Sequence, residues 1–306
     1  MALAETAAGD LPGLGDVLGG FQRILGELSV DCELALPGAW EIGRSKGVPD
    51  SPIDWKDSGR LRVVKEVPGG TLDPGKLVAG LARAAVERNA VILENQPVTG
   101  IEWKERPIIE AGGERCSAGK ILLATNALSL HLTNFPDLTN FPGHAEPKLT
   151  LAIATESLSE EQLGAIGLAG GNPFYTVDLP YLWGRLLPQG SVIFGAGLVD
   201  APKSRDLKQI DIGKGKAPEL FTAIERRIRS LHPALEKTKF THRWGGPILF
   251  TETWRPVFHW HPRSKNAIVL GAYAGHGVAL STYLGAWAAE VSLGRRKLPR
   301  WGSPQE

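Results

Sequence analysis

The chain of 306 residues is 42% hydrophobic, which is enough for one large or two medium-sized globular domains with real cores. Its 34 basic and 33 acidic residues leave a net charge of +1, so we expect neither nucleic acid nor an anionic membrane as a partner. The two cysteines, Cys32 and Cys116, lie far apart without metal-ligand spacing. This excludes a disulfide scaffold, a zinc site and an iron–sulfur cluster and favours a reducing, cytoplasmic location.

The N-terminal ten residues carry no basic region and no long apolar stretch. No other part of the chain approaches the run of about 18 apolar residues that a membrane span needs. We therefore expect neither a signal peptide nor a membrane anchor.

The first predicted elements are a helix, a strand and a second helix. Apolar residues recur at roughly helical spacing over residues 18–28, and residues 61–67 have the pattern of a strand. Thr71 or Asp73 is expected to cap a helix that begins at Pro74 and continues through Asn89.

Three further strands are predicted over residues 90–94, 98–103 and 120–125. Together with the second helix they indicate a β-α-β arrangement. The text Leu-Thr-Asn-Phe-Pro then occurs at 132–136 and again at 138–142. Two copies are too few for a solenoid, so we interpret this duplication as an irregular loop and a domain boundary.

After residue 149 the pattern changes to that of an antiparallel α+β module. Strands are predicted over 149–155, 181–187 and 192–198, followed by an amphipathic helix over 218–231. A strand over 237–244 is expected to be broken by Gly245-Gly246-Pro247.

The most informative segment covers residues 266–290: a short apolar run, the turn Gly271-Ala-Tyr-Ala-Gly-His-Gly-Val278, and a helix without proline. This order places the free backbone N–H groups of a helix N-terminus at the end of a buried strand, where an anionic or electron-rich ligand can bind. The usual Gly-x-Gly-x-x-Gly dinucleotide turn is missing from the chain. The nearest match, Gly13-Leu-Gly-Asp-Val-Leu-Gly19, has one residue too many and no apolar strand before it.

Five motifs occur along the chain in the order Gly69-Gly70-Thr-Leu-Asp-Pro74, Ala124-Thr-Asn-Ala127, Phe194-Gly-Ala-Gly-Leu198, Arg243-Trp-Gly-Gly246 and Gly271-Ala-Tyr-Ala-Gly-His-Gly-Val278. As an ordered set, they resemble the motifs of the FAD-dependent oxidoreductases of the D-amino-acid oxidase type, which include glycine, sarcosine and γ-glutamylputrescine oxidases. The resemblance implies a mixed α/β and α+β fold: an incomplete FAD-binding Rossmann-like domain (68–130 and 245–302) and an antiparallel-sheet substrate domain (21–67 and 131–244).

The resemblance also implies roles for individual residues. Val98 matches a position near the adenine, although an ordinary core valine is an equal alternative. Thr125 and Asn126 match a strand end beside the cofactor, or a turn that caps a following helix. The backbone of Gly275, His276, Gly277 and Val278 matches the turn that faces the flavin N1–C2=O edge. A helix N-terminus there stabilises the negative charge of the reduced ring.

Four side chains are candidates for substrate contacts. The side chain of His276 could orient a substrate or tune the flavin, or act only as a local hydrogen-bond donor. Tyr181, Trp183 and Arg185 are spaced to share one face of a strand, and the resemblance places that strand above the flavin; a packed core face with Arg185 at its rim is the simpler alternative. His259 and His261 share a predicted strand face but lack a third ligand, so no metal is expected.

The segment that follows the Arg243 motif departs from the family pattern in one respect. Family members that oxidise free amino acids have an arginine just after the strand of the Arg243 motif, whereas this chain continues Pro247-Ile-Leu-Phe-Thr251. The departure favours an amine, or a substrate whose carboxylate binds elsewhere, and the Arg-Trp-Gly-Gly form is nearest to the γ-glutamylputrescine oxidase branch.

Two functions follow from the resemblance. The first is FAD-dependent oxidation of the C–N bond of a small amine or amino acid to an imine. The second is a non-catalytic role, as a truncated remnant or as a subunit that cannot hold FAD alone, because the missing glycine turn supplies the diphosphate contacts of the cofactor. Weak or absent FAD binding is expected for this chain.

Overall fold

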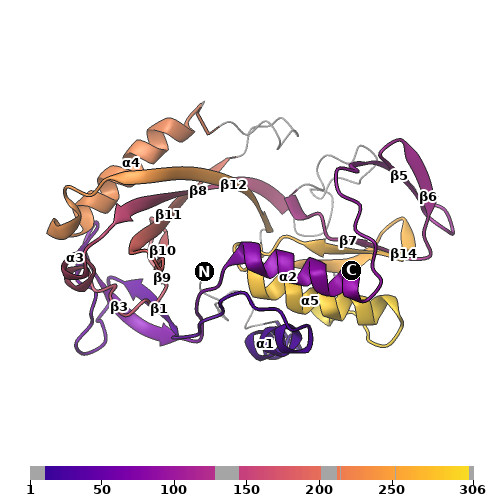
Figure 1. The fold of residues 1–306 in the computed structure, drawn as a ribbon, viewed down its shortest axis with the longest axis horizontal. Helices are drawn as coiled ribbons and strands as arrows, with labels where there is room; N and C mark the ends of the chain where they lie inside the picture. The colour runs from indigo at the N-terminus through magenta and orange to yellow at the C-terminus, as the bar shows by residue number, and fades with distance from the viewer. Residues whose placement is uncertain (1–10, 128–144, 201–211, 214, 252, 303–306) are drawn as a thin grey trace.

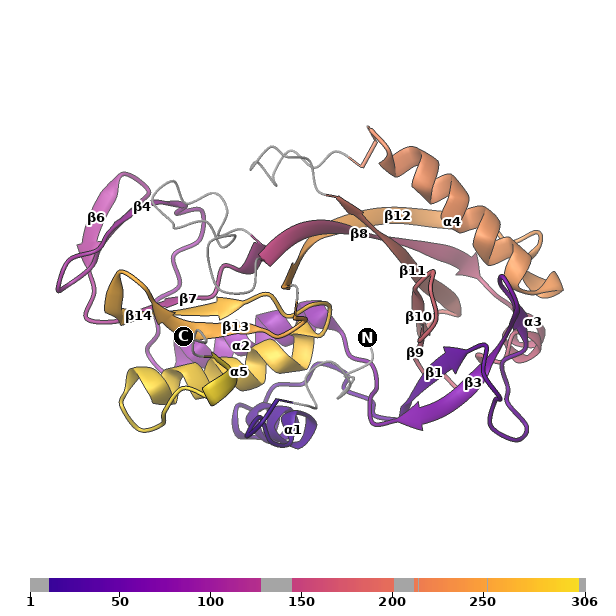
Figure 2. The ribbon, with the colours of Figure 1, turned by 180° about the vertical axis from the view of Figure 1, so that it is seen from behind.

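The computed structural model describes residues 11–127, 145–200, 212–213, 215–251 and 253–302. The duplicated Leu-Thr-Asn-Phe-Pro segment lies outside these residues. The elements form two lobes joined by long strands (Figures 1 and 2), which agrees with the mixed α/β and α+β class expected from the sequence. The boundaries proposed for the two domains stay a prediction.

The first lobe is built on an eight-stranded sheet with the strand order β12-β8-β11-β10-β9-β1-β3-β2. Its neighbouring strands are antiparallel except for β1 and β9. Its strands are β1 (Ala39–Gly43), β2 (Trp55–Lys56), β3 (Arg60–Val67), β8 (Ala145–Ser157), β9 (Phe174–Thr176), β10 (Leu182–Leu186), β11 (Ser191–Asp200) and β12 (Phe240–Thr251). The helices of this lobe are α3 (Glu160–Ala165), α4 (Ala217–Leu231) and the short η4 (Pro233–Leu235).

Helix α4 lies along the outer side of this sheet (Figure 1). Its apolar stripe, which includes Phe221 and Ile228, packs into a core centred on Trp55, Phe174 and Phe194. The ring of Trp55 meets that of Phe174 edge-on at a centroid distance of 5.0 Å, an arrangement that aromatic quadrupoles favour. This core therefore fixes the helix on the sheet.

The second lobe has a small sheet, β13-β14-β7, in which β7 is parallel to β14 and β13 is antiparallel to it. A further sheet, β4-β5-β6, is antiparallel. The strands are β4 (Val98–Glu102), β5 (Ile108–Ala111), β6 (Glu114–Ser117), β7 (Ile121–Leu123), β13 (Val257–His261) and β14 (Ser264–Gly271). The helices are α1 (Val17–Glu27), α2 (Pro74–Glu87), α5 (Gly277–Ser292) and the short η5 (Arg300–Gly302).

Helix α5 covers one face of β13 and β14, as Figure 2 shows. Its Leu280 and Leu284 share a buried cluster with Phe258 and Ile268 of those strands. Helix α1 approaches α5 closely: a Cβ added at Gly20 would lie 2.4 Å from the ring of Tyr283. Gly20 therefore allows α1 and α5 to pack closely.

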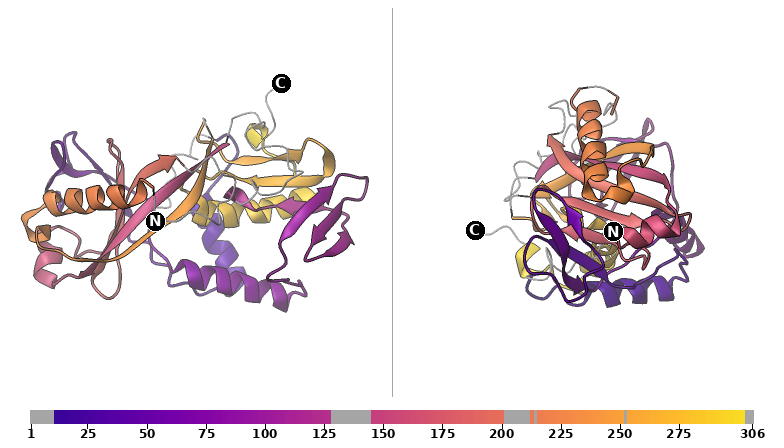
Figure 3. Two further views of the ribbon diagram at one scale, coloured as in Figure 1. Left: turned by 90° about the horizontal axis from the view of Figure 1, so that it is seen from above. Right: turned by 90° about the vertical axis from the view of Figure 1, so that its left-hand side faces the viewer.

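Strands β8 and β12 connect the two lobes (Figures 1 and 3). Their ends contribute Ala145 and Leu249 to a core that also contains Ile121, Leu123 and Val269 of the small sheet. The position of the small sheet is therefore tied to the large one through buried side chains.

Most elements predicted from the sequence are confirmed, including the helix that begins at Pro74. Its cap is Asp73, whose carboxylate accepts a hydrogen bond from the backbone N–H of Lys76 at 2.9 Å. Two predictions were wrong. Residues 90–94 form no strand, because no described strand lies beside them to pair with. Strand β12 continues through Pro247, which pairs with Leu149, because β12 is an edge strand and the missing N–H can face away from β8.

No helix among the described residues is both long enough and apolar enough to cross a membrane.

The packing of β10 on β11 gives a prediction for stability. A Cβ at Gly195 would lie 2.0 Å from the indole of Trp183, whereas one at Gly246 would meet nothing within 4 Å. We expect Gly195→Ala to lower the free energy of unfolding by about 1–3 kcal/mol through overpacking, and Gly246→Ala to be neutral or slightly stabilising. Urea denaturation of both variants measures the difference, and equal midpoints would contradict the described register.

Candidate functional site

The segment from β14 to α5 folds as strand, turn and helix, as the sequence predicts. Within the turn, Ala272, Ala274 and Gly275 have φ angles of 55°, 49° and 90°. Glycine takes such angles freely, whereas each alanine is strained there. Strain of this kind persists only where the surrounding structure fixes the backbone, and it concentrates at functional sites.

The N-terminus of α5 is open. His276 is the N-cap residue, and its side chain makes no capping hydrogen bond. The first amides of the helix have no intrahelical acceptor and carry partial positive charge. Residues 275–278 are each partly exposed, so the turn is not packed shut. These backbone N–H groups are therefore available to an anionic or electron-rich group.

The end of β7 lies beside this turn. The Asn126 side-chain carbonyl accepts a hydrogen bond from the backbone N–H of Ala272 at 2.9 Å, although the two residues are 146 positions apart. A Cβ at Gly271 would meet Asn126 at 3.3 Å, so the two segments approach closely. Because β7 and β14 are parallel, both end at the same edge of the sheet, which is where α/β folds bind ligands. The structure thus places Asn126, at the end of β7, against the start of the turn that continues to residues 275–278.

Burial shifts the pKa values of two side chains of the turn, His276 and Tyr273. Burial lowers the pKa of His276, against hydrogen bonds to the carbonyls of Ala274 and Tyr273 that raise it. The Nδ1 atom of His276 lies 3.1 Å from the Ala274 carbonyl oxygen. Burial also raises the pKa of Tyr273. Both groups are therefore neutral near pH 7, and the positive end of α5 is the charge that the turn presents.

Val98 does not belong to the sheet that carries the turn. It begins β4, pairs with Ala111, and belongs to the sheet β4-β5-β6, which shares no strand with β7 and β14. Its side chain is 38% exposed. Its predicted contact with an adenine stays a prediction.

Arg185 connects β10 of the large sheet to the start of α2. Its Nη1 donates a hydrogen bond to the Leu72 carbonyl oxygen at 2.7 Å. Burial lowers the pKa of Arg185, and the Asp73 carboxylate opposes that change. The side chain of Leu72 packs in one cluster with Val278 and Ala279 of α5. Leu72 therefore links Arg185 to the turn, because its carbonyl oxygen bonds the guanidinium and its side chain packs with Val278.

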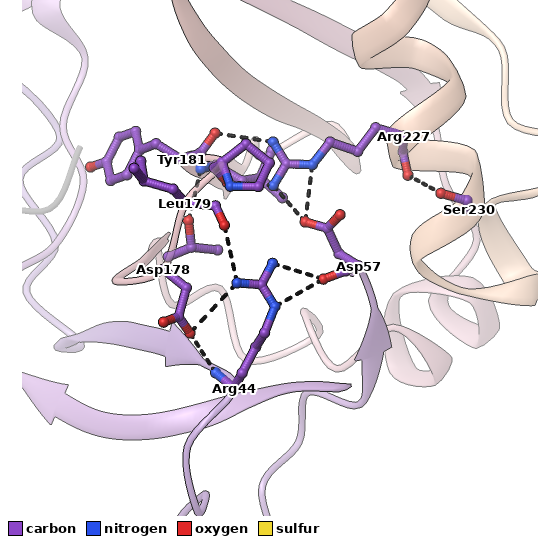
Figure 4. Close-up of polar contacts among 10 residues, drawn as sticks. Arg44, Asp57, Asp178, Leu179, Tyr181, Arg227 and Ser230 are labelled. Carbon is purple, nitrogen blue, oxygen red and sulfur yellow. Dashed lines mark hydrogen bonds and ion pairs between the residues drawn. The ribbon is translucent and has the colours of Figure 1, made fainter. Parts of the chain in front are cut away.

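Tyr181 does not share a strand with Arg185, because β10 begins at Leu182. Its backbone carbonyl accepts a hydrogen bond from Arg227, and its ring points away from the polar cluster drawn in Figure 4. The ring is 43% exposed. The predicted common face is thus reduced to Trp183 and Arg185.

A polar cluster that the sequence did not indicate joins α4 to the β2–β3 turn (Figure 4). The guanidinium of Arg227 contacts the Asp57 carboxylate at 2.5 Å, and both side chains are largely buried. Arg44 donates to the Asp57 carbonyl oxygen at 2.8 Å. No local motif marks these residues, which are 170 positions apart, so only the folded chain could reveal them.

Two surface grooves of about 490 and 960 Å³ lie between α4 and the β2–β3 turn. They are lined by residues from 54–60 and 223–236. Neither groove includes a residue predicted to hold cofactor or substrate. The smaller groove is instead lined by Asp57 and Arg227 of the ion pair.

The histidines of β13 are packed side chains. His261 stacks on Trp103 at a centroid distance of 3.8 Å, and His259 Nδ1 lies 2.8 Å from the Trp260 carbonyl oxygen. Burial lowers the pKa of both, that of His261 to about 4. Within the described part of the chain, no group of three or more His, Cys, Asp and Glu residues could hold a metal ion.

The environment of His276 gives a prediction for pH. Its pKa is below the ordinary value of about 6.5, so between the two values the unfolded chain binds the proton and the folded chain does not. The stability contributed by neutral His276 is therefore present above about pH 6.5 and lost as the pH falls. Imidazole resonances assigned with His276→Asn should show a midpoint below 6.5; a midpoint at or above 6.5 would contradict this environment.

The sequence is similar to a known family and to curated proteins. The sequence pattern of the family described as FAD dependent oxidoreductase matches residues 51–291. The probable oxidoreductase OrdL of Rhizobium meliloti (strain 1021) is 27% identical over 237 residues, which are 76% of this chain and 49% of the relative. The Haemophilus influenzae protein of the same name is 26% identical, over 74% of this chain and 48% of the relative. The chain spans about half the length of these curated relatives.

Solved structures share the fold. Glycine oxidase from Geobacillus kaustophilus superimposes with a TM-score of 0.68 at 14% identity, covering 94% of this chain and 82% of that one. Iminodiacetate oxidase from Chelativorans sp. BNC1 gives the same TM-score, identity and coverage. Since the family pattern covers well over half of the sequence, the chain belongs to the D-amino-acid oxidase type of FAD-dependent oxidoreductases.

Proposed function

We propose that this chain supplies the flavin-ring and substrate side of an oxidoreductase that converts the C–N bond of a small amine or amino acid to an imine. The observation that carries the proposal is the open N-terminus of α5, held beside the end of β7 by Asn126. Membership of a family of FAD-dependent oxidoreductases supports the ring of FAD as the group that such amides would face. Bound FAD would supply the acceptor for two electrons.

The residues of the turn have a defined part in this chemistry. The backbone N–H groups at 277 and 278 would face the electron-rich edge of the ring, and the partial positive charge of α5 favours negative charge there. Because the donors belong to the backbone of a strained turn, they are oriented before any ligand arrives. The side chain of His276 is neutral near pH 7 and is not required for this role.

The proposed substrate class is inferred from the structural neighbours and from the arginines of the large sheet. Two structural neighbours are named as glycine oxidase and iminodiacetate oxidase, which supports a small amine or amino acid as the substrate class. Strand β12 carries no arginine between 247 and 251, and the Arg243 guanidinium is bound to Glu225. Arg185 is a basic side chain linked to the turn through Leu72. An uncharged amine end is therefore the part of the substrate that we place over the ring.

The nearest match to a phosphate-binding turn, residues 13–19, is not suited to hold the diphosphate of FAD. Residues 13–19 hold the nearest match to a phosphate turn, but there the Asp16 carboxylate accepts the hydrogen bond from the Gly19 N–H at 2.8 Å. Leu14 is buried, and its carbonyl oxygen accepts a hydrogen bond from the Tyr283 hydroxyl. A carboxylate in this place repels phosphate, and no strand precedes the turn within residues 11–16. This segment packs α1 on α5.

The division between ring and diphosphate can be measured with two ligands. If the chain holds only the ring, FAD and riboflavin should bind with dissociation constants equal within about threefold. If a diphosphate cradle were present, the dissociation constant of FAD would be lower than that of riboflavin by about 100-fold or more. Quenching of flavin fluorescence by the purified chain distinguishes these results. Failure of both ligands to bind at millimolar concentration would contradict the proposed site.

The backbone role of the turn can be separated from that of the His276 side chain. An aspartate at this N-cap position would accept hydrogen bonds from the amides of α5 and should raise the free energy of unfolding by about 1 kcal/mol. The same bonds would occupy the donors that face the ring. His276→Asp should therefore be more stable yet lose riboflavin binding.

His276→Ala is the matched control, because it leaves the amides free. We expect it to retain riboflavin binding within about threefold. Loss of binding in His276→Ala would assign the ring to the side chain, and binding retained by His276→Asp would contradict the role of the α5 amides.

A further inference from the structure

The two faces of the large sheet carry different rows of side chains. Cross-strand partners share a face, because side chains alternate along each strand. One row includes Phe174, Phe194 and Ile153, which belong to the core beneath α4. The neighbouring row lies on the opposite face, which we call the inner face. In strand order it consists of Trp244, Ala152, Gly195, Trp183, Tyr175 and Glu41.

The inner face is the side of the sheet that meets the glycine turn. Ile248 follows Trp244 by four residues in β12, with no bulge between them, so both side chains lie on this face. A Cβ added at Gly275 would lie 3.7 Å from Cδ1 of Ile248. The row that ends at Glu41 is therefore on the same side of the sheet as the open N-terminus of α5.

The carboxylate of Glu41 is buried without a cation. Glu41 is 9% exposed, and its Oε1 accepts a hydrogen bond from the Tyr175 hydroxyl at 2.7 Å. Among the described residues no basic side chain forms an ion pair with it, not even Lys65, its cross-strand neighbour in β3. Its Oε2 is accessible and accepts no hydrogen bond from the described part of the chain. Because a buried carboxylate is normally paired with a positive group, this position lacks a cation.

Aromatic side chains beside Glu41 favour a cation that carries an alkyl chain. Tyr175 and Trp183 pack in one apolar cluster. The indole of Trp183 lies over Gly195, since a Cβ there would be 2.0 Å from the ring. Indole and phenol rings attract ammonium groups through their faces and bury alkyl chains against them. The surroundings of the carboxylate therefore complement an alkylammonium ion.

From these observations we propose that Glu41, positioned by Tyr175 and flanked by Trp183, binds an alkylammonium group. The identity of that group rests on the proposed function: it is the second amine of a substrate whose first amine is oxidised over the ring. The substrate class is thereby narrowed from a small amine to one with a second, cationic amine.

The sheet sets the separation of the two amines. Arg185 lies two residues from Trp183 in β10, on the same face, and is linked to the turn through Leu72. Glu41 lies two strands away from β10. With strands about 5 Å apart and residues of one face about 7 Å apart, Glu41 is on the order of 10 Å from Arg185 along the sheet. An alkyl chain must therefore separate the reacting amine from the second one.

The subsite can be tested on the full chain without any flavin. The probe is butylammonium, and butanol is its neutral control of the same chain length. We expect the dissociation constant of butylammonium to be lower than that of butanol by about tenfold or more. The largest changes in ¹H–¹⁵N resonances should occur at Glu41, Tyr175 and the Trp183 indole. Equal binding of the two probes, or changes confined to other residues, would overturn the proposal.

Matched variants locate the charge. Glu41→Gln can still accept the Tyr175 hydrogen bond but has no charge, so it should lose the preference for butylammonium. Its urea midpoint should be equal to or above that of the unchanged chain, because an unpaired buried carboxylate is removed. Glu66→Gln makes the same change at an exposed residue, the cross-strand partner of Trp40 on the opposite face, and should leave the preference intact. A preference that survives in Glu41→Gln, or that both variants lose equally, would contradict the subsite.

A final measurement joins the subsite to the ring site and keeps the two claims separable. In the chain loaded with riboflavin, diaminobutane should bind about tenfold or more tightly than butylamine, and Glu41→Gln should remove this difference. No difference in the loaded chain would overturn the assignment of the cation to the substrate. If riboflavin binds but butylammonium shows no dependence on Glu41, the subsite is wrong and the ring site stands. If butylammonium binds at Glu41 and no flavin binds, the ring site is wrong and the cation subsite stands.

Discussion

One hydrogen bond holds the candidate site together, between the side-chain carbonyl of Asn126 and the backbone N–H of Ala272. It joins the ends of two parallel strands that come from distant parts of the sequence. Because the Ala272 amide is taken up at the start of the turn, the chain must change direction through residues of positive φ before α5 begins. The open amides of the helix are a consequence of this geometry.

The strain in the turn is informative because the rest of the lobe supports it. Two alanines in left-handed conformations cost about 1 kcal/mol or more each, and a chain without another use for the turn could remove that cost with glycine. Buried contacts on both sides fix the turn: Leu249 of β12 accepts a hydrogen bond from the Ala274 N–H, and α5 packs on Ile268. The large sheet and the small one thus jointly determine where the amides point.

Sequence reasoning identified the elements whose signals are local. The capped start of α2, the amphipathic pattern of α4 and the glycine turn before α5 each depend on a few neighbouring residues, and all were predicted correctly. The two predictions that were wrong both concern strand pairing. Residues 90–94 have the composition of a strand but lack a neighbour, and Pro247 is tolerated only because β12 lies at a sheet edge.

The same distinction applies to the candidate site. The grouping of Asn126 with residues 275–278 follows from the order of motifs, whereas the contact of Arg185 with Leu72 and the Asp57–Arg227 ion pair depend on segments that meet only after folding. The place of β7 at the edge of the described small sheet is likewise a property that only the folded chain shows.

The most direct test of the account is a map of where a flavin ring touches this chain. Backbone ¹H–¹⁵N resonances followed during addition of lumiflavin, which has a ring and no diphosphate, would provide it. The account predicts the largest shifts at Gly277 and Val278, with smaller ones at Thr125 and Asn126. Shifts confined to the grooves beside α4, or none at the turn, would contradict it.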